Sequence, residues 1–333
     1  MPILDGQLFV AEESTPGPAV TPAAGDLVTI EAGSSVFQVA GQTEPISRNL
    51  IKGYLDRPQA VTPQSRYWAL SLNTEFKAPT GTPSYSAPTA TNPPEIHTLL
   101  LCAGMEVDGD ADQIDYSFTP EPNGTQTSAT VVMEGIGTSP NHYTANGCNF
   151  GFSVSSTPGE RIMWTWTGMG GFNNPAAGSP SSGTVNEGVP FVQSTDFSIA
   201  GYVPGDDVLV IRDWTLTAGL SVTPRPDQAG TGLHKFPGVI VRDNNVSGSI
   251  TVEETTVTAT KIWDRFTGAT DPTDLTVTVG TGLTSDTRTC LFTVAGAVFG
   301  APQPSQGTPN LWTIPFMGTG AASDDPSLMI TFK

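Results

Sequence analysis

The chain has 333 residues and a mass of 34.8 kDa, more than one small domain needs. Glycine (36) and proline (29) are frequent and only 14% of the residues are charged, which excludes a helical bundle and a coiled coil. Acidic residues outnumber basic ones by 32 to 14, giving a net charge of −18. Because proteins that bind nucleic acids need basic side chains against the phosphates, this composition excludes affinity for DNA.

The cysteines and the apolar runs point to a compartment. Cys102, Cys148 and Cys290 are too few for a disulfide framework, and we expect them to be buried free thiols. Residues 1–5 show no basic region followed by an apolar one, so we expect no secretory signal. The longest apolar run, 99–105, is far shorter than the ~18 residues of a membrane span. These features predict a soluble, unsecreted protein made in a reducing cytoplasm.

Alternation of apolar and polar residues with a period of two dominates the chain. Trp68, Leu70 and Leu72, for example, alternate with polar or small residues within 66–77. Successive side chains of a strand face opposite sides of a sheet, so this pattern predicts half-buried antiparallel strands. In chain order we expect strands at 66–77, 114–118, 150–154, 162–166, 214–223, 246–252 and 275–279. The predicted fold class is all-β.

Only two segments have the spacing of an amphipathic helix. Residues 95–103 follow a start signal at Asn92, place apolar side chains at i, i+3, i+4 and i+7, and end before Gly104. Residues 258–267 repeat this spacing and end before Gly268. Two short helices with matching ends, in a chain of strands, suggest a duplication.

The order of the predicted elements supports this interpretation. Matching features in the two halves are offset by 160 to 166 residues, and the strand at 214–222 would correspond to one near 35–40. Residue-level similarity is faint, which leaves coincidence as the alternative. We predict two tandem β-sandwich domains, each with one short α-helix packed on its sheet. Their bounds are 1–170 and 190–333, with a Gly/Ser/Pro-rich linker at 171–189.

The residues that carry chemistry in other proteins are not arranged for it here. His97, His142 and His234 do not have the spacing of metal ligands, and no G-x-S-x-G sequence is present. Asp108, Asp110 and Asp112 resemble the start of a calcium loop. However, glutamine at position 113 and threonine at position 119 replace the required glycine and glutamate. We interpret this segment, like the acidic pair at 324–325, as a solvated turn.

Glycine clusters and tryptophans have equally plain interpretations. The clusters at 135–137, 168–171 and 280–282 do not open a helix, as phosphate-binding loops do, and we predict turns. The six tryptophans fall mostly at core positions rather than on a sugar-binding platform. We therefore predict no catalytic, cofactor-binding or metal-binding residues, no cofactor, and no enzymatic activity.

Three segments together resemble the major tail tube proteins of long-tailed (siphovirus-type) bacteriophages. Residues 11–26 are similar to the opening before their first strand. Residues 68–76, a proline-rich loop and 94–105 are similar to their strand and short helix. Residues 143–154 and 158–168 resemble their paired strands, joined by a Gly-Glu turn. The second half resembles the family only in its order of elements.

The resemblance implies a structural virion protein whose rings stack into the hollow tube through which DNA leaves the phage head. Family rings usually contain six one-domain chains; a duplicated chain would form rings of three, and rings of six chains stay the alternative. Tape measure, tail terminator and baseplate proteins would be its neighbours, and DNA would pass through the lumen without specific binding. A negative lumen would repel phosphates. The family resemblance places the protein in the virion, and no membrane partner is expected.

Two alternatives stay open at this level. A surface-layer or adhesin-type β-sandwich protein would share the acidity and the low cysteine content, but would carry a secretory signal. A carbohydrate-binding module or glycosidase would need aromatic side chains or paired carboxylates on an exposed face. The polar loops at 84–92, 172–188 and 301–308 would either stack rings, cover the outside of the tube, or serve only as linkers.

Overall fold

The computed structural model describes residues 6–15, 17–31, 36–40, 43–47, 59–63, 66–118, 127–135, 141–157, 160–178, 183, 185, 188–199, 211–224, 239–253, 273–281, 287–305, 310–320 and 326–333. These residues form an almost entirely β structure with one α-helix, α1 (His97–Cys102), and one 3₁₀ turn, η1 (Ala24–Asp26). The predicted all-β class is confirmed. The second predicted helix, 258–267, lies outside the described residues.

The strands of the first half are β1 (Gly6–Glu13), β2 (Leu27–Val28), β3 (Phe37–Ala40), β4 (Thr43–Ser47), β5 (Gln59–Pro63), β6 (Tyr67–Glu75), β7 (Ser84–Ser86), β8 (Thr89–Thr91), β9 (Glu106–Asp110), β10 (Gln113–Ser117), β11 (Ser128–Gly135), β12 (Asn141–Ser156), β13 (Met163–Phe172) and β14 (Ala176–Ala177). The second half contributes β15 (Gln193–Ile199), β16 (Ile211–Pro224), β17 (Val239–Asn244), β18 (Val246–Glu253), β19 (Thr273–Gly280), β20 (Thr289–Phe299), β21 (Gln303–Ser305), β22 (Leu311–Gly318) and β23 (Leu328–Phe332). Each strand predicted from alternation overlaps one of these.

Eight of these strands form one continuous antiparallel layer. Its order is β3-β6-β13-β12-β16-β18-β22-β21, and the end of β20 continues the line of β21 along β22. Strands from both halves of the chain therefore lie in the same sheet, joined where β12 pairs with β16. We call this layer the eight-stranded sheet.

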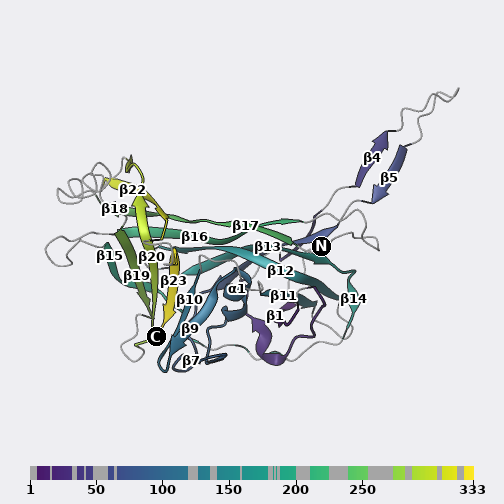
Figure 1. Ribbon diagram of the computed structural model, residues 1–333, viewed down its shortest axis with the longest axis horizontal. Coiled ribbons are helices and arrows are strands. Elements are labelled where there is room, and N and C mark those ends of the chain that lie inside the picture. The colour runs from purple at the N-terminus through teal and green to yellow at the C-terminus, as the bar shows by residue number, and fades with distance from the viewer. Residues whose placement is uncertain are drawn as a thin grey trace.

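The long strands β12 and β20 leave this layer and enter a second one. The first part of β12 pairs with β11, which is followed by β1 and β2. The first part of β20 pairs on one edge with β19, followed by β15, and on the other with β23, followed by β10 and β9. Figure 1 shows β12, β13 and β16 lying over α1, β11 and β1.

The helix begins and ends close to the predicted positions. Its last turn closes with hydrogen bonds from the amides of Gly104 and Met105 to the carbonyls of Leu101 and Leu100, at 3.0 and 3.2 Å. Gly104 has a φ of +86°, a left-handed conformation that favours glycine. Leu99, Leu100 and Cys102 are buried against the second layer, where α1 contacts β1, β11 and β12. The apolar face predicted for 95–103 is thus what fixes the helix in place.

The two halves of the chain repeat one strand order. In the first half, six strands lie in the order β1-β11-β12-β13-β6-β3. In the second half, β15-β19-β20-β22-β18-β16 lie in the same order when each set is numbered along the chain. In both, the second and third strands continue outward as a long hairpin, through β4 and β5 or through β17. Figure 1 shows β4 and β5 extending away from the body.

The strand order and the constant sequence offset equate different strands of the two halves. Strand β11 corresponds to β19 and β13 to β22, whereas the offset of 160 to 166 residues would equate β10 with β19. The difference arises because α1 and β7–β10 lie between the third and fourth strands of the first half, while only residues 254–272 lie there in the second. The equivalence of β16 with β3 agrees with the expected correspondence between the strand at 214–222 and the one near 35–40.

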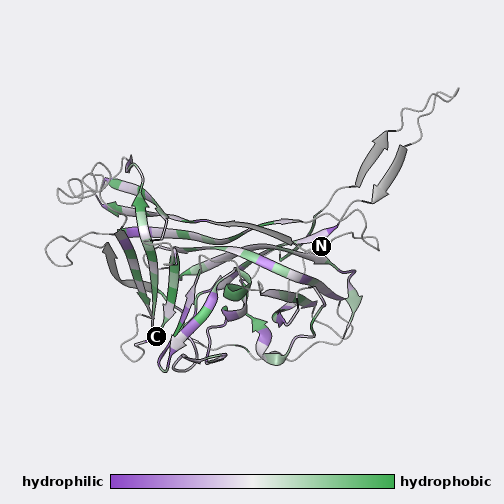
Figure 2. Cartoon of the chain, in the orientation of Figure 1, coloured by the Kyte–Doolittle hydropathy of each residue, from purple (hydrophilic) through white to green (hydrophobic). Residues whose placement is uncertain are grey.

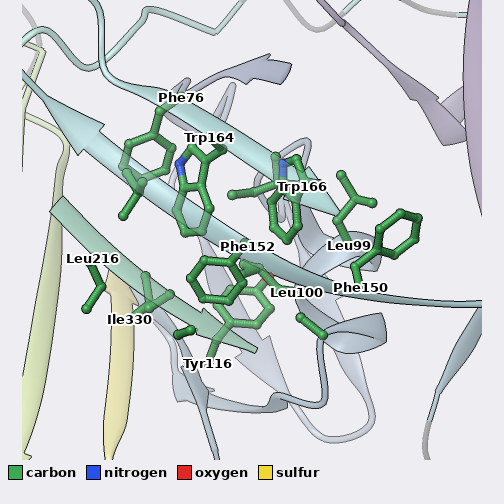
Figure 3. Close-up of a cluster of buried hydrophobic side chains, with 14 of the residues drawn as sticks. Phe76, Leu99, Leu100, Tyr116, Phe150, Phe152, Trp164, Trp166, Leu216 and Ile330 are labelled. Atoms are coloured by element: carbon green, nitrogen blue, oxygen red, sulfur yellow. The ribbon is translucent and has the colours of Figure 1, made fainter. Parts of the chain in front are cut away.

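The halves share one core instead of having two. Phe76 and Trp164 of the first half lie 5.9 and 6.0 Å, between ring centroids, from Phe292 of the second, and Phe76 lies 5.7 Å from Phe332. Hydrophobic and polar residues alternate along the strands that enclose this core (Figure 2). Figure 3 shows its central side chains facing one another: Phe76, Leu99, Leu100, Tyr116, Phe150, Phe152, Trp164, Trp166, Leu216 and Ile330. A small second cluster holds Phe9, Leu27 and Val132.

Several segments predicted as linkers or turns are strands. Part of the 171–189 linker belongs to β13 or forms β14, which pairs with β12. The 84–92 loop is the β7–β8 hairpin, and 301–308 includes β21. Gly168 and Gly170 lie inside β13, not in a turn. Glycine is needed at these positions because β12 approaches β13 closely. A Cβ at Gly168 would lie 2.4 Å from the Asn149 carbonyl oxygen, and one at Gly170 would lie 2.3 Å from Cys148 Sγ.

Candidate functional site

The face of the eight-stranded sheet that points away from the core is a polar surface built by both halves of the chain. On the other face, Trp164, Leu216 and their neighbours are buried. Directly paired residues form rows across the polar face. One such row reads Asn73, Thr165, Ser153, Thr217, Ser247, Met317. The four central side chains of this row carry hydroxyl groups, the row crosses six adjacent strands, and it ends at the exposed Met317. We call this surface the hydroxyl face.

Hydroxyl groups on this face bond to one another across strands. Thr215 Oγ1 lies 3.0 Å from Ser249 Oγ, and Thr251 Oγ1 lies 3.4 Å from Thr313 Oγ1. Such cross-strand pairs stabilise the sheet while satisfying part of the polar surface internally. Among the described residues of β6, β13, β12, β16, β18 and β22 on this face, charge is confined to one end of the strands. The centre of the face is neutral.

A shallow hollow of about 290 Å³ lies in the middle of the hydroxyl face, where β12 meets β16. Gly151 and Gly219 pair across this junction, and a Cβ on Gly219 would lie 2.9 Å from the Gly151 Cα. The hollow therefore exists because the two strands carry glycine at their closest point. Besides these glycines, its lining contains six hydroxyl-bearing residues and four others: Ser153, Thr165, Thr167, Thr217, Ser221 and Ser247, with Phe152, Ala218, Leu220 and Asn245. It has no charged side chain in its lining and offers no group that could act as a nucleophile's base.

The charged end of the hydroxyl face has its arginines paired with acids. Arg161 lies 3.2 Å from Glu75 and 3.8 Å from Glu31, between nitrogen and carboxylate oxygen. Arg212 pairs with Glu253 at the matching end of the second half. These arginines are half exposed, so the pairs add little stability. They do, however, neutralise the positive charge nearest to this face.

The acidic segment singled out in the sequence is a tight hairpin. Strands β9 and β10 pair Asp110 with Gln113, so only residues 111 and 112 form the turn. A calcium loop surrounds its ion with about twelve residues, whereas here strand β10 begins at Gln113, directly after the two-residue turn, so no such loop forms. Asp108 lies directly opposite Asp115, whose Oδ2 accepts a 3.0 Å hydrogen bond from Gln113. Within the described part of the chain, no three His, Cys, Asp or Glu residues are grouped to hold a metal ion.

The two described histidines lie apart, and each has a polar side chain beside one of its ring nitrogens. His97 Nδ1 lies 2.6 Å from the Tyr116 hydroxyl, and burial lowers the pKa of His97 to about 4. The neutral imidazole thus closes the polar contact between α1 and β10. His142 Nδ1 lies 3.8 Å from Glu134 Oε1, on the neighbouring strand β11. His234 and the acidic pair at 324–325 lie outside the described residues.

A buried carboxylate that sequence reasoning missed organises the N-terminal segment. Glu13 is 4% exposed. Its carboxylate accepts hydrogen bonds from the hydroxyls of Ser128 and Thr130, at 2.6 and 2.8 Å, and from the amides of Gly147 and Gly17, at 2.8 and 2.9 Å. Four donors satisfy a buried negative charge, which would otherwise be costly. The only sequence signal was an acid at an inward position of an apolar strand.

The cysteines and tryptophans behave as predicted wherever they are described. All three cysteines are free and buried, and burial raises the pKa of each thiol well above its usual range. Trp68, Trp164, Trp166 and Trp214 are at most 3% exposed, while Trp312 packs at the edge of the core. Trp263 lies outside the described residues. The tryptophans described do not form an exposed sugar-binding platform.

Comparison with known proteins leaves the family open: no protein-family model matches the chain, and no curated protein matches it. In the described part of the chain, α1 is the one α-helix, and it is much too short to cross a bilayer.

Proposed function

We propose that this chain is a tube-forming structural protein, the tail tube protein of a long-tailed bacteriophage, in which the hydroxyl face lines the lumen. The observation that carries the proposal is the eight-stranded sheet. Two equivalent sets of four strands lie side by side in one layer, and the polar side of this layer has a neutral centre rich in serine and threonine. A protein that surrounds a passing polyanion needs a large surface to which phosphates do not bind.

The charge distribution supports this role. The whole chain has 32 acids and 14 lysines and arginines, and three of the described bases, Lys77, Arg161 and Arg212, lie beside carboxylates. The sequence-based hypothesis gave the lumen a negative surface. The hydroxyl face would instead give the passing DNA a lumen with a neutral centre and acidic side chains at one end. Neither surface attracts phosphate, so DNA would slide without specific binding.

The repeat of strand order supports a ring of three chains. Each chain offers two similar units, so three chains would present six units around the lumen, as the resemblance to six-membered family rings implies. Rings close when one heterologous contact recurs by rotation. Stacked rings would then form the tube, and the β4–β5 hairpin, which extends from the body (Figure 1), would contact a neighbouring ring in this proposal.

Negative-stain electron microscopy of the concentrated protein tests the proposal. End-on views should show hollow rings with three pairs of lobes, and side views should show striated tubes. A planar lattice would favour a surface-layer protein instead. Monodisperse chains without a channel at high concentration would contradict the tube role.

A charge substitution tests the assignment of the lumen. Ser153→Lys, Thr167→Lys and Thr217→Lys together add three positive charges at the centre of the hydroxyl face. Assembled tubes of this variant should retain short duplex DNA at low salt and release it as salt rises. A control variant, Asp108→Asn, Asp110→Asn and Asp112→Asn, changes the net charge equally on the β9–β10 hairpin. Equal DNA retention by the two variants would show that the hydroxyl face does not line the lumen.

A further inference from the structure

The eight-stranded sheet has two edges, and both are formed by short strands. Strand β3 pairs with β6 on one side, and within the described residues no strand pairs with its other side. Strand β21 pairs with β22 and likewise has no described strand on its outer side. Its three residues, Gln303, Pro304 and Ser305, are all exposed. Open strand edges are sites where further strands add.

The interior of the same sheet shows how such an edge can be covered. Where the halves meet, β16 pairs with β12, and Thr217 lies opposite Ser153. By strand order, β16 is the equivalent of β3: each starts the long hairpin and pairs with the strand that ends it. Likewise β12, and its equivalent β20 continued by β21, each pair with the last strand of their half, β13 or β22. The β12–β16 junction is therefore an internal copy of a β21–β3 contact that one chain alone cannot make.

Equivalent residues follow from the register. Glu75 and Glu253 end the third strands of the two halves, so Gln38, which pairs with Ala69, occupies the position of Thr217, which pairs with Ser247. Met163 and Leu311 begin the last strands. Their partners are Ser155 and Ser305, so Gln303 takes the position of Ser153.

Val39 supports this equivalence. It pairs with Trp68, whose side chain faces the core, yet Val39 is 60% exposed. Its equivalent, Ala218, pairs with Phe152 across the junction and is only 3% exposed. An inward-facing valine at a sheet edge is exposed because the neighbouring strand is missing. A strand placed along β3 as β12 lies along β16 would cover it.

Building on the proposed ring, we infer that β3 of one copy pairs antiparallel with β21 of the next copy, with Gln38 opposite Gln303. The occupant of each edge is a second copy of this chain. Antiparallel pairing is what the sheet requires: its eight strands alternate in direction, so β21 and the next β3 alternate as well. The contact joins two different edges, so it is heterologous and propagates from copy to copy.

Disulfide trapping tests the pairing directly. Gln38→Cys and Gln303→Cys are introduced into one chain, which is concentrated and mildly oxidised. Within a chain the two positions lie on opposite edges of the sheet with six strands between them, a span of about 30 Å, so they cannot join. The native cysteines are buried and do not compete. We expect a ladder of covalent dimers, trimers and closed rings on a denaturing gel.

A register control and an assembly variant complete the design. Gln38→Cys with Pro304→Cys shifts one partner by one residue, which turns its side chain to the opposite face, and should give no ladder. Val39→Asp should abolish assembly in sedimentation experiments, whereas Val185→Asp, at a valine that is 57% exposed and lies outside β3, β20 and β21, should not. Assembly of Val39→Asp to the wild-type extent would overturn the inference.

The outcomes separate this inference from the proposed function. Rings or tubes that form without a Gln38–Gln303 link overturn the edge pairing and leave the tube role standing. A ladder whose products are open filaments supports the pairing and contradicts the tube. Wild-type chains that do not assemble, together with a Gln38→Cys/Gln303→Cys variant that gives no ladder, overturn both.

Discussion

Replacing the buried carboxylate of Glu13 is the sharpest test of how the N-terminal segment is held. In Glu13→Gln the side chain keeps its shape but loses its charge. In the wild-type chain, each carboxylate oxygen of Glu13 accepts one hydrogen bond from a hydroxyl and one from a backbone amide. Thr130 and Gly147 donate to one oxygen, and Ser128 and Gly17 donate to the other. Whichever way the glutamine turns, its NH₂ group faces one backbone N–H. A hydroxyl can rotate to accept a hydrogen bond, but an amide cannot.

The expected cost follows from these contacts. One buried N–H without a partner costs about 1–3 kcal/mol, and the remaining hydrogen bonds lose the contribution of the ionised acceptor. We expect Glu13→Gln to lower the free energy of unfolding by about 2–4 kcal/mol. Glu12 precedes it on the same strand and is exposed, so Glu12→Gln serves as the control and should change stability by less than about 0.5 kcal/mol.

Urea titrations followed by tryptophan fluorescence measure the difference. The transition of Glu13→Gln should move to clearly lower urea concentration than that of Glu12→Gln. Coincident transitions for the two variants would refute the reasoning, because they would show that the four donors find other acceptors at no cost. Limited proteolysis should also cut the Glu13→Gln variant sooner within residues 6–20.

Two further predictions concern the core. The folded-state pKa of His97 is about 4, below its usual 6.5, so the unfolded chain binds a proton at a higher pH than the folded chain does. The stability contributed by neutral His97 is therefore fully present above pH 6.5 and is lost as the pH falls towards 4. His97→Gln should reduce the fall in urea midpoint between pH 7 and pH 4.5; an undiminished fall would show that His97 is not responsible. Gly168→Ala should destabilise by at least about 2 kcal/mol, because its Cβ meets the Asn149 carbonyl at 2.4 Å. Gly25→Ala, where nothing lies within 4 Å, should be close to neutral in thermal melts, and equal melting temperatures for the two would contradict this packing.

Alternation in the sequence was sufficient to place the strands, because the inward half of each strand is strongly apolar. Trp68, Leu70 and Leu72 are all buried on the face that the pattern predicts. The polar positions of the same alternation form the hydroxyl face, but the order in which the strands pair decides which serines and threonines become neighbours. Ser153 and Thr165 become neighbours because β12 and β13 are consecutive strands, whereas Thr217 joins them only because β16, much later in the chain, pairs with β12.

What could not be predicted depends on long-range pairing. The equivalence of the halves was misplaced because insertions of different length separate corresponding strands. Glycines in β13 were interpreted as turns, although they accommodate the close approach of β12. Glu13 gave almost no signal, since the donors that satisfy it come from residues 17, 128, 130 and 147. The shared core was equally invisible, because Phe76 and Phe292 are brought together only by the complete sheet.

The pairing of β10 with β23 has a consequence for biosynthesis. Tyr116 packs against Phe332 with ring centroids 5.8 Å apart, so the first half of the chain buries its own aromatic residues against the strand that is translated last among those described. Until Phe332 leaves the ribosome, that part of the core is open, and residues synthesised early must wait in an incomplete state. Nascent chains on neighbouring ribosomes would therefore not present a finished sheet to one another. Folding as one unit delays self-association until each chain is ready for it.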